Sequence, residues 1–321
     1  MGRLRTAKDI VMRFASIDIG TNTVLLLIAE ADSSGHLHTL FEKQRIIRLG
    51  KNVDAQKNIA HEGMDKLTHV LTEYLQDAAN HQTAKIVIGA TSAMRDAANK
   101  ETILNEIYHR TGQRIQILTG DEEAQWTFQG GCLALPPLTR HPILLIDIGG
   151  GSTEFVVGSA SDMTFKKSLN IGAVRMTERF INHDPPLQSE LESLRRYAHN
   201  EFDTHLSGIK NIQPAHALGV AGTVTTLCAM LQALPHYDPK RINGYMIDKA
   251  ALDSLIEKLS DLTLEERRKI PGLEPERADV IIAGATILSE IFSFFNLDKI
   301  TVSNFGLRYG LILRELANHG Q

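Results

Sequence analysis

Several features that would mark a specialised class of protein are scarce or absent in this sequence. Its 321 residues include only two cysteines, Cys132 and Cys228, both in apolar segments, so we interpret them as reduced core thiols rather than a disulfide. No stretch approaches the ~20 uninterrupted apolar residues of a membrane span. Residues 1–12 are basic and polar, without the apolar core of a signal peptide. We therefore expect a cytoplasmic protein without a membrane partner, with residues 1–13 as an N-terminal tail.

An excess of charge of one sign is also missing. The net charge of −4 argues against a nucleic-acid partner that binds over the whole surface. Hydrophobic residues make up 43% of the chain and charged residues 22%, which is ordinary for a globular protein. A chain of this length is too long for one small core, so we expect an α/β protein with two domains.

One stretch is present twice, each time at the end of an apolar run. The first copy is Asp18-Ile19-Gly20-Thr21-Asn22-Thr23, and the second is Asp147-Ile148-Gly149-Gly150-Gly151-Ser152-Thr153-Glu154. Each is typical of a strand followed by a tight turn whose backbone N–H groups can bind an anion. A carboxylate beside bound phosphate is compatible with a divalent cation between them, since Mg²⁺ prefers these oxygens. We expect two half-sites that face each other across a cleft.

Hydrophobic periodicity predicts that the order of elements also repeats. In the first half we expect strands 14–19, 22–31 and 37–48, helix 60–79, strand 85–90, helix 93–110, strand 114–118 and helix 119–133. In the second half we expect strands 143–146, 155–159 and 163–169, helices 172–181 and 187–206, strand 216–220, a helix ending at 234, helices 248–262 and 274–295, strand 299–303 and helix 307–317. Pro136-Pro137 indicates a boundary, so the predicted domains are 14–135 and 136–305, with residues 306–318 packed back on the first.

Two further segments have a binding interpretation and a structural alternative. Residues 219–227 form a third glycine-rich turn before a helix, whose N-terminus attracts anions, but Gly219 and Gly222 also suit close helix–strand packing. Ser92 and Arg95 follow a buried strand, where a hydroxyl and a guanidinium suit phosphate. The alternative for that segment is a helix cap with a solvated arginine.

The acidic run at 121–123 divides into two roles. Thr119 and Glu122 match a capping box, in which Glu122 bonds back to the start of the helix. Glu123 is left free, and a carboxylate at the cleft could orient or deprotonate an attacking water. On spacing alone, acidic residues that stabilise a positive helix end are the simpler interpretation. Arg45, Arg48 and Lys51 are interpreted as a solvated edge, with the tail of a polyphosphate as the alternative.

Taken in order, the motifs resemble the exopolyphosphatase / guanosine pentaphosphate phosphohydrolase (Ppx/GppA) family from about Phe14 to Leu316. They are D-I-G-T-N-T at 18–23, T-S-A-M-R at 91–95, G-D-E-E-A at 120–124, D-I-G-G-G-S-T-E at 147–154, G-A-V-R at 172–175, G-V-A-G-T at 219–223 and S-N-F-G-L-R at 303–308. The resemblance implies two actin-like ATPase (ribonuclease-H-like) domains, each of βββαβαβα type, with the active site in the cleft between them.

The resemblance also implies an activity. It is the Mg²⁺-dependent release of the terminal phosphate from inorganic polyphosphate, or of the 5′ γ-phosphate from pppGpp to give ppGpp. Mn²⁺ is an alternative divalent ion, a monovalent cation such as K⁺ is a further candidate cofactor, and a homodimer is a candidate assembly. The chain does not contain the helical C-terminal domain of longer members, so we expect a short form, which favours short chains or nucleotides.

Site residues follow from positions in the family motifs. Glu123 corresponds to the catalytic base, and Asp147 and Glu154, with help from Asp18, would hold the metal. The implied phosphate-binding residues are Gly20, Thr21, Asn22, Thr23, Ser92, Arg95, Gly149, Gly150, Gly151, Ser152, Thr153, Gly222 and Thr223. Because only the second aspartate turn ends in a glutamate, we expect the first turn to cradle phosphate and the second to hold metal.

Two residues of the last motif depart from the family pattern, and two other functions are alternatives to phosphate release. Asn304 and Tyr309 stand where the family usually carries Asp and Glu, which affects the geometry of the closing loop. A sugar or acetate kinase of the same fold would use similar turns but need an acceptor. A nucleotide- or alarmone-binding regulator with weak turnover would bind pppGpp or ppGpp without efficient hydrolysis.

Overall fold

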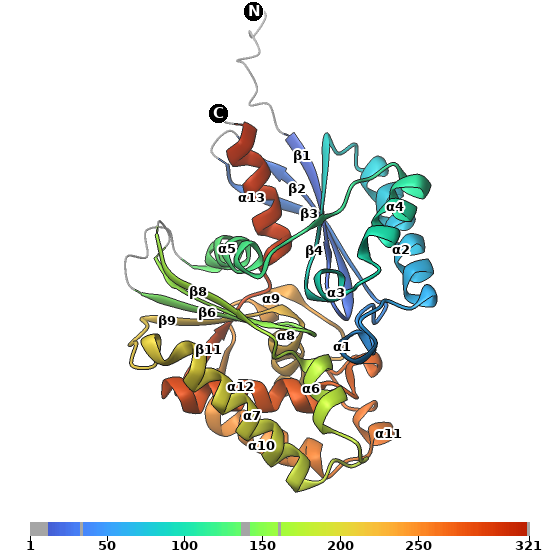
Figure 1. The fold of residues 1–321 in the computed structure, drawn as a ribbon. Helices are drawn as coiled ribbons and strands as arrows, with labels where there is room; N and C mark the ends of the chain where they lie inside the picture. The colour runs from blue at the N-terminus through green and yellow to red at the C-terminus, as the bar shows by residue number, and fades with distance from the viewer. Residues whose placement is uncertain (1–11, 33–34, 136–141, 160–161, 320–321) are drawn as a thin grey trace, which may run out of the picture.

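The computed structural model describes residues 12–32, 35–135, 142–159 and 162–319, which form two mixed β-sheets surrounded by helices (Figure 1). The first sheet has the order β3-β2-β1-β4-β5 and the second the order β10-β11-β9-β6-β7-β8. The strands are β1 (Met12–Ile19), β2 (Thr23–Ala31), β3 (Leu37–Ile46), β4 (Lys85–Ala90), β5 (Gln116–Ile117), β6 (Ile143–Ile148), β7 (Thr153–Gly158), β8 (Met163–Leu169), β9 (His216–Val220), β10 (Met246–Asp248) and β11 (Lys299–Val302).

The helices lie on both sides of each sheet. They are α1 (Val53–Gln56), α2 (His61–Asn80), α3 (Ser92–Asp96), α4 (Lys100–Thr111), α5 (Gly120–Gly131), α6 (Ala173–Phe180), α7 (Gln188–Leu206), α8 (Ala221–Leu231), α9 (Pro239–Ile242), α10 (Lys249–Ser260), α11 (Leu264–Arg267), α12 (Ile281–Phe295) and α13 (Leu307–His319), with 3₁₀ turns η1 (Cys132–Ala134), η2 (Ser207–Ile209) and η3 (Pro275–Arg277). None of the helices among these described residues is long and apolar enough to cross a membrane.

The two halves share a strand plan that brings their aspartate turns together. In each half three antiparallel strands are followed by a fourth that runs parallel to the first, namely β4 beside β1 and β9 beside β6. Asp18 is the penultimate residue of β1, and Asp147 is the penultimate residue of β6. Because both carboxylates occupy the same position of the same plan, each lies where its sheet opens toward the other half.

Each sheet has its own apolar core, and the closing helix joins the halves. One large cluster packs around β1, β2, α2 and α4, and another around β6, β7, α7 and α12. α13 contacts β1, β2 and β4 on the face of the first sheet opposite α2, while α5 lies between α13 and the second sheet (Figure 1). Ala124 and Phe128 of α5 pack with residues of the second sheet. Cys132 and Cys228 are free thiols, as predicted. The predicted boundary at Pro136-Pro137 lies outside the described residues.

Two of the predicted helices differ from the structure, and one strand was not predicted. The predicted helix 93–110 is two helices, because Ala97 is extended, the Ala98 amide donates to the Lys57 carbonyl at 2.6 Å, and Asn99 bonds both backbone groups of Ile59. The predicted helix 274–295 begins only at Ile281, after η3. The strand β10 was missed; it has three residues and is held by pairing with β11.

α13 approaches α5 through glycines. A Cβ placed on Gly310 of α13 would collide with the backbone carbonyl of Trp126 in α5, and one placed on Gly130 of α5 would collide with the carbonyl of Gly306. Backbones this close leave no room for any side chain, so glycine is required at both positions. The contact fixes how the last helix closes on the first sheet.

We predict that Gly310→Ala lowers the free energy of unfolding by about 2 kcal/mol, the usual size of an overpacking penalty. Urea titration followed by circular dichroism measures it. Gly306→Ala is the matched control, because a Cβ there meets nothing within 4 Å. Equal stabilities of the two variants would show that α13 does not depend on this approach.

Candidate active site

A cavity of about 700 Å³ lies between the two halves. Its wall contains residues of both aspartate turns, of the third glycine-rich turn, and the predicted carboxylates Asp18, Glu123 and Asp147. From the predicted site it includes Asp18, Gly20, Thr21, Asn22, Thr23, Ser92, Glu123, Asp147, Gly149, Gly150, Ser152, Gly222 and Thr223. Four predicted residues, Arg95, Gly151, Thr153 and Glu154, do not line it. Most of the residues named from sequence motifs are therefore brought to one place.

The two aspartate turns have the same internal geometry. In the first, the Gly20 amide donates to the Thr23 carbonyl at 3.0 Å; in the second, the Gly149 amide donates to the Ser152 carbonyl at 3.0 Å. The carbonyls of Thr21, Asn22, Gly149 and Gly150 accept bonds from elsewhere in the chain, so it is the backbone amides of the two turns that can face an anion.

The two turns also touch each other. A Cβ on Gly150 would lie 3.0 Å from Cβ of Thr21, and a Cβ on Gly151 would collide with Oγ of Ser92. The Thr21 and Ser92 hydroxyls are themselves hydrogen-bonded at 2.7 Å. Glycine in the second turn therefore allows the two half-sites to meet.

Four carboxylates lie around the cavity, and desolvation raises the pKa of each. Desolvation, together with the charge of Glu123, raises the pKa of Asp18 to about 7, although Arg308 opposes the shift. The same two causes raise the pKa values of Asp147 and Glu154 well above the usual range. Desolvation also raises the pKa of Glu123, against the nearby Arg95. So many carboxylates in a dry site repel one another unless a cation is shared between them.

Two buried polar atoms at the cavity have no protein partner. They are Oδ1 of Asp18, which accepts, and Nδ2 of Asn22, which donates. An unpaired buried polar atom costs about 1–3 kcal/mol. A cation beside Asp18 and a phosphate oxygen beside Asn22 would satisfy both, so these atoms fit the predicted ligands.

The donor set suits Mg²⁺ only with ligands from the substrate. Among the described residues, no group of three or more His, Cys, Asp or Glu side chains is arranged to hold a metal by itself. Mg²⁺ commonly takes one or two carboxylates and completes its shell with water and phosphate oxygens. Asp18 and Asp147 line the cavity and fit that role. Glu154 lies deeper, is 1% exposed, and accepts a 2.6 Å hydrogen bond from Ser168.

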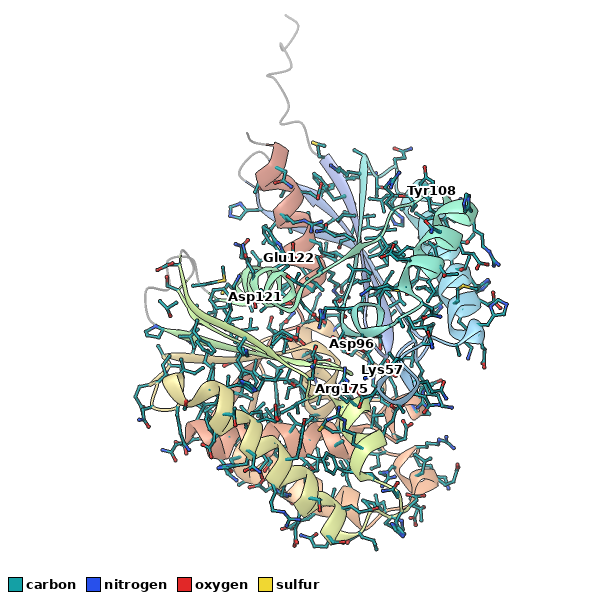
Figure 2. The ribbon with its side chains drawn as sticks, in the orientation of Figure 1. Lys57, Asp96, Tyr108, Asp121, Glu122 and Arg175 are labelled. Carbon is teal, nitrogen blue, oxygen red and sulfur yellow. The ribbon has the colours of Figure 1, made fainter. Side chains whose placement is uncertain are left out.

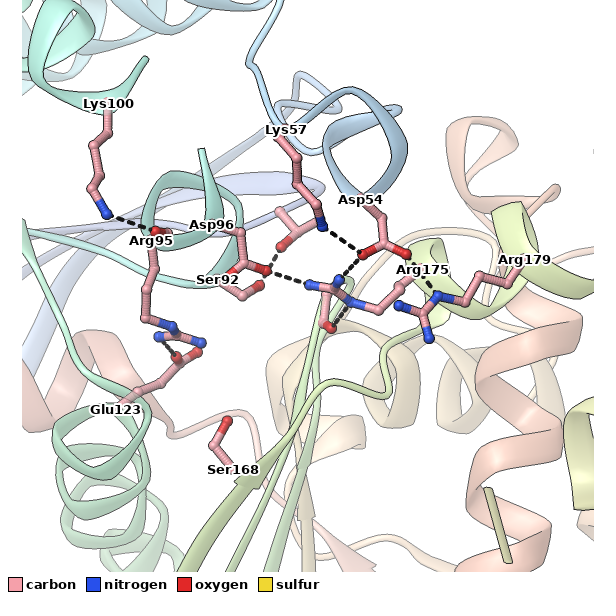
Figure 3. A network of polar contacts seen from close by, with 12 residues as sticks. Asp54, Lys57, Ser92, Arg95, Asp96, Lys100, Glu123, Ser168, Arg175 and Arg179 are labelled. Carbon is pink, nitrogen blue, oxygen red and sulfur yellow. Dashed lines mark hydrogen bonds and ion pairs between the residues drawn. The ribbon is translucent and has the colours of Figure 1, made fainter. Parts of the chain in front are cut away.

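Glu123 and Glu122 have different environments, although they are adjacent on α5. Glu122 accepts from the Thr119 amide at 2.8 Å while Thr119 accepts from the Glu122 amide, so the predicted capping box is confirmed. Glu123 is 7% exposed, lines the cavity and accepts a 2.9 Å bond from Nη1 of Arg95 (Figure 3). Arg95 also donates to the Leu118 carbonyl at 3.0 Å. Arg95 thus orients Glu123 rather than facing the cavity.

The third glycine-rich turn, in residues 219–227, packs against neighbouring elements and also lines the cavity. Gly219 lies against Val224 and Ile300, which matches the packing interpretation. Ala221 has a left-handed φ of 68° and lines the cavity, a strained conformation that is common at functional sites. The guanidinium of Arg277 lies over Gly222, so a side chain at position 222 would force Arg277 to shift.

Arg277 and Arg308 line the cavity but were missed by the sequence analysis. Arg277 donates to Oγ1 of Thr23 at 3.1 Å and therefore reaches across to the first turn. Arg308 pairs with Glu42 at 2.8 Å. The motif S-N-F-G-L-R marked Arg308 as part of a pattern without giving it a role, and nothing in its spacing marked Arg277.

The basic cluster of strand three lies outside the cavity wall. Arg45 pairs with Glu73 at 2.6 Å, and Arg48 pairs with Asp279 of the second half at 2.6 Å. Lys51 is exposed. The contacts of Arg45 and Arg48 favour the structural interpretation over a polyphosphate track.

Two phosphate-type turns that meet over buried carboxylates define an enzyme site for phosphate chemistry. The sequence matches the Ppx/GppA phosphatase family over residues 27–319, and the chain belongs to this family. The membership confirms the expected enzyme class, a hydrolase acting on phosphoric anhydrides.

Individual relatives agree with this assignment over almost their whole length. Exopolyphosphatase 2 of Mycobacterium tuberculosis is 32% identical over 313 residues, which cover 94% of this chain and 98% of the relative. The Aquifex aeolicus Ppx/GppA family member has a TM-score of 0.81 at 29% identity, covering 97% of this chain and 99% of that one. An exopolyphosphatase from Cytophaga hutchinsonii has a TM-score of 0.85 at 29% identity, covering 96% and 98%. The expected α/β fold is confirmed: the chain has two mixed sheets with helices and shares its fold with Ppx/GppA family structures.

We predict that Mg²⁺ stabilises the protein more at pH 8 than at pH 5. With pKa values raised in the fold, the folded state binds more protons than the unfolded state, so metal-free stability falls as the pH rises from about 4 to about 7. A divalent cation offsets that loss only where the carboxylates are ionised. Thermal unfolding with MgCl₂ or EDTA should show a shift of several degrees at pH 8 and a smaller one at pH 5.

Asp18→Asn provides the matched variant for this experiment. It removes one buried charge, so the metal-free melting temperature at pH 8 should rise and the Mg²⁺ response should shrink. A wild-type response to Mg²⁺ in this variant, or equal shifts at both pH values, would contradict a carboxylate-bound cation at the cavity.

Proposed function

We propose that the chain is a Mg²⁺-dependent phosphohydrolase that releases the terminal phosphate from inorganic polyphosphate or from pppGpp. The observation that carries this proposal is Glu123, a buried carboxylate at the wall of a cavity formed by two phosphate-type turns. Membership of the phosphatase family and the similarity to exopolyphosphatases support it.

In the proposed mechanism, water attacks the terminal phosphorus in line with the bridging oxygen that leaves. A P–O bond forms to the water, the bridging P–O bond breaks, and the proton of the water passes to Glu123. The raised pKa of Glu123 makes it a stronger base near neutral pH. Backbone amides of the two turns and the side chain of Asn22 would hold phosphate oxygens, and Asp18 and Asp147 would hold the cation. Bound Mg²⁺ would neutralise charge on the phosphate oxygens.

We expect Glu123→Gln to lower kcat by about 10²–10⁴-fold, the usual contribution of a general base, while substrate binding is retained. Release of phosphate, measured colorimetrically, tests it. Glu122→Gln is the control: it changes the capping box on the neighbouring residue, so it should cost some helix stability and leave kcat near wild type. Phosphate release at the wild-type rate by Glu123→Gln would refute the assignment.

The part of the cavity wall that lies outside the glycine-rich turns favours pppGpp as the second candidate substrate. Its lysine and arginine residues, Lys43, Arg277 and Arg308, are each paired with a carboxylate. The rest of that wall is largely apolar and includes Leu234, Pro235, Tyr237, Leu273, Pro275 and Ile281. A long polyanion needs unpaired cations along its path, whereas a nucleoside suits an apolar wall with few polar groups.

Side-by-side assays distinguish the substrates. With Mg²⁺ and no acceptor, we expect a higher kcat/KM for pppGpp and tripolyphosphate than for long-chain polyphosphate. Tyr237→Ala should lower kcat/KM for pppGpp by roughly fivefold, since an aromatic contact is worth about 1 kcal/mol, and leave tripolyphosphate unchanged. Faster release from long chains would overturn the preference. A requirement for a carbon acceptor would favour a kinase, and tight ppGpp binding without release would favour a regulator.

A further inference from the structure

Arg175 lies in the G-A-V-R segment, and none of the steps above uses it. It is the third residue of α6, the helix that follows β8, and it is 8% exposed. Its Nε donates to the Gly151 carbonyl at 2.8 Å. Its two Nη atoms pair with Asp54 of α1 and Asp96 of α3 (Figure 3). One side chain therefore bonds the second turn and two helices of the first half.

The position of Arg175 makes these contacts a link between halves. Figure 2 shows it beside Asp96 where α6 of the second half meets α1 and α3 of the first. A planar guanidinium can serve three acceptors at once, which a lysine ammonium does with less defined geometry. A further contact on the same side, from the Asn52 amide to Glu178 at 2.8 Å, also crosses between the halves.

The link reaches the proposed catalytic group through α3. Asp96 directly follows Arg95, and Arg95 holds Glu123. A shift of α3 relative to the second half would move Arg95 together with Ser92, the α3 residue that packs on Gly151 of the second turn. The cradle itself has members from both halves, because Gly150 and Gly151 pack on Thr21 and Ser92. Its assembly therefore depends on the halves staying closed.

We propose that Arg175 is a positioning residue, a clasp that holds the two halves closed and so assembles the phosphate cradle before substrate arrives. Arg175 does not line the main cavity, so it acts through Gly151, Asp54 and Asp96 and not by contact with substrate. If the clasp is opened, the competent state is populated less and apparent affinity falls by the same fraction. Bound substrate can still draw the halves together, so the rate at saturation is retained.

The chain offers a matched control one turn further along the helix. Arg179 pairs with the same Asp54, at 2.6 Å, and also contacts Tyr197. Among the described residues, Arg179 forms no hydrogen bond or ion pair with Gly151 or Asp96. The Arg179 side chain is 36% exposed, whereas the Arg175 side chain is 9% exposed. Arg179→Gln removes a cationic side chain and an Asp54 pair but leaves the clasp.

The test compares Arg175→Gln with Arg179→Gln in the full-length protein. Small-angle X-ray scattering without ligand should give a larger radius of gyration for Arg175→Gln alone. In phosphate-release assays, KM for tripolyphosphate should rise about tenfold with kcat within twofold of wild type, whereas Arg179→Gln should stay near wild type. In Arg175→Lys the rise in KM should be smaller than in Arg175→Gln.

Other outcomes decide against the clasp. Identical scattering and KM in the two glutamine variants, or a loss confined to kcat, would overturn it. If Arg175→Gln does not fold, Asp96→Asn removes one arm of the clasp and should give a smaller shift of KM in the same direction; an unchanged KM would overturn it as well. The kinetic arm rests on the proposed function. Failure of the wild type to release phosphate would refute that function, while the scattering would still decide on the clasp.

Discussion

Repulsion among buried carboxylates is the constraint on which the site depends. Asp18, Asp147, Glu154 and Glu123 come from four different elements, and desolvation raises the pKa of each. Such a cluster is unfavourable in a protein without a ligand. In the proposed mechanism a cation and the phosphates of the substrate would offset this cost, which would link folding stability to function at this cleft.

The duplicated strand plan explains where these charges lie, and the differences between the halves explain what they do. Both turns are closed by the same hydrogen bond, from the glycine amide to the third residue after it. In the first half the Thr21 hydroxyl of the turn is hydrogen-bonded to the Ser92 hydroxyl. In the second half Glu154 of β7 lies opposite Asp147 of the adjacent strand β6. Glu123 belongs to neither turn but to α5, which packs between the closing helix and the second sheet.

Local signals in the sequence were enough to predict some of this and not the rest. The aspartate turns and the Thr119–Glu122 capping box depend on neighbours in the chain, so their spacing was sufficient. The break between α3 and α4 was missed because it is set by bonds from Ala98 and Asn99 to residues some forty positions earlier. The partner of Arg95 and the place of Arg277 were missed for the same reason, since each depends on a distant helix or turn.

The return of α13 has a consequence for how the protein is made. The Ser16 hydroxyl of β1 donates to the Arg308 carbonyl at 2.7 Å, and Phe14 and Leu27 share a core cluster with Tyr309 and Ile312. Within the described residues, α13 therefore covers β1 and β2 on this face of the first sheet, and Trp126 of α5 joins it beside β4. During synthesis on the ribosome, that face stays exposed until α13 has emerged, almost 300 residues after β1. The N-terminal half is thus the first to be translated and the last to be completed, and it is the part for which we expect chaperone protection to matter most.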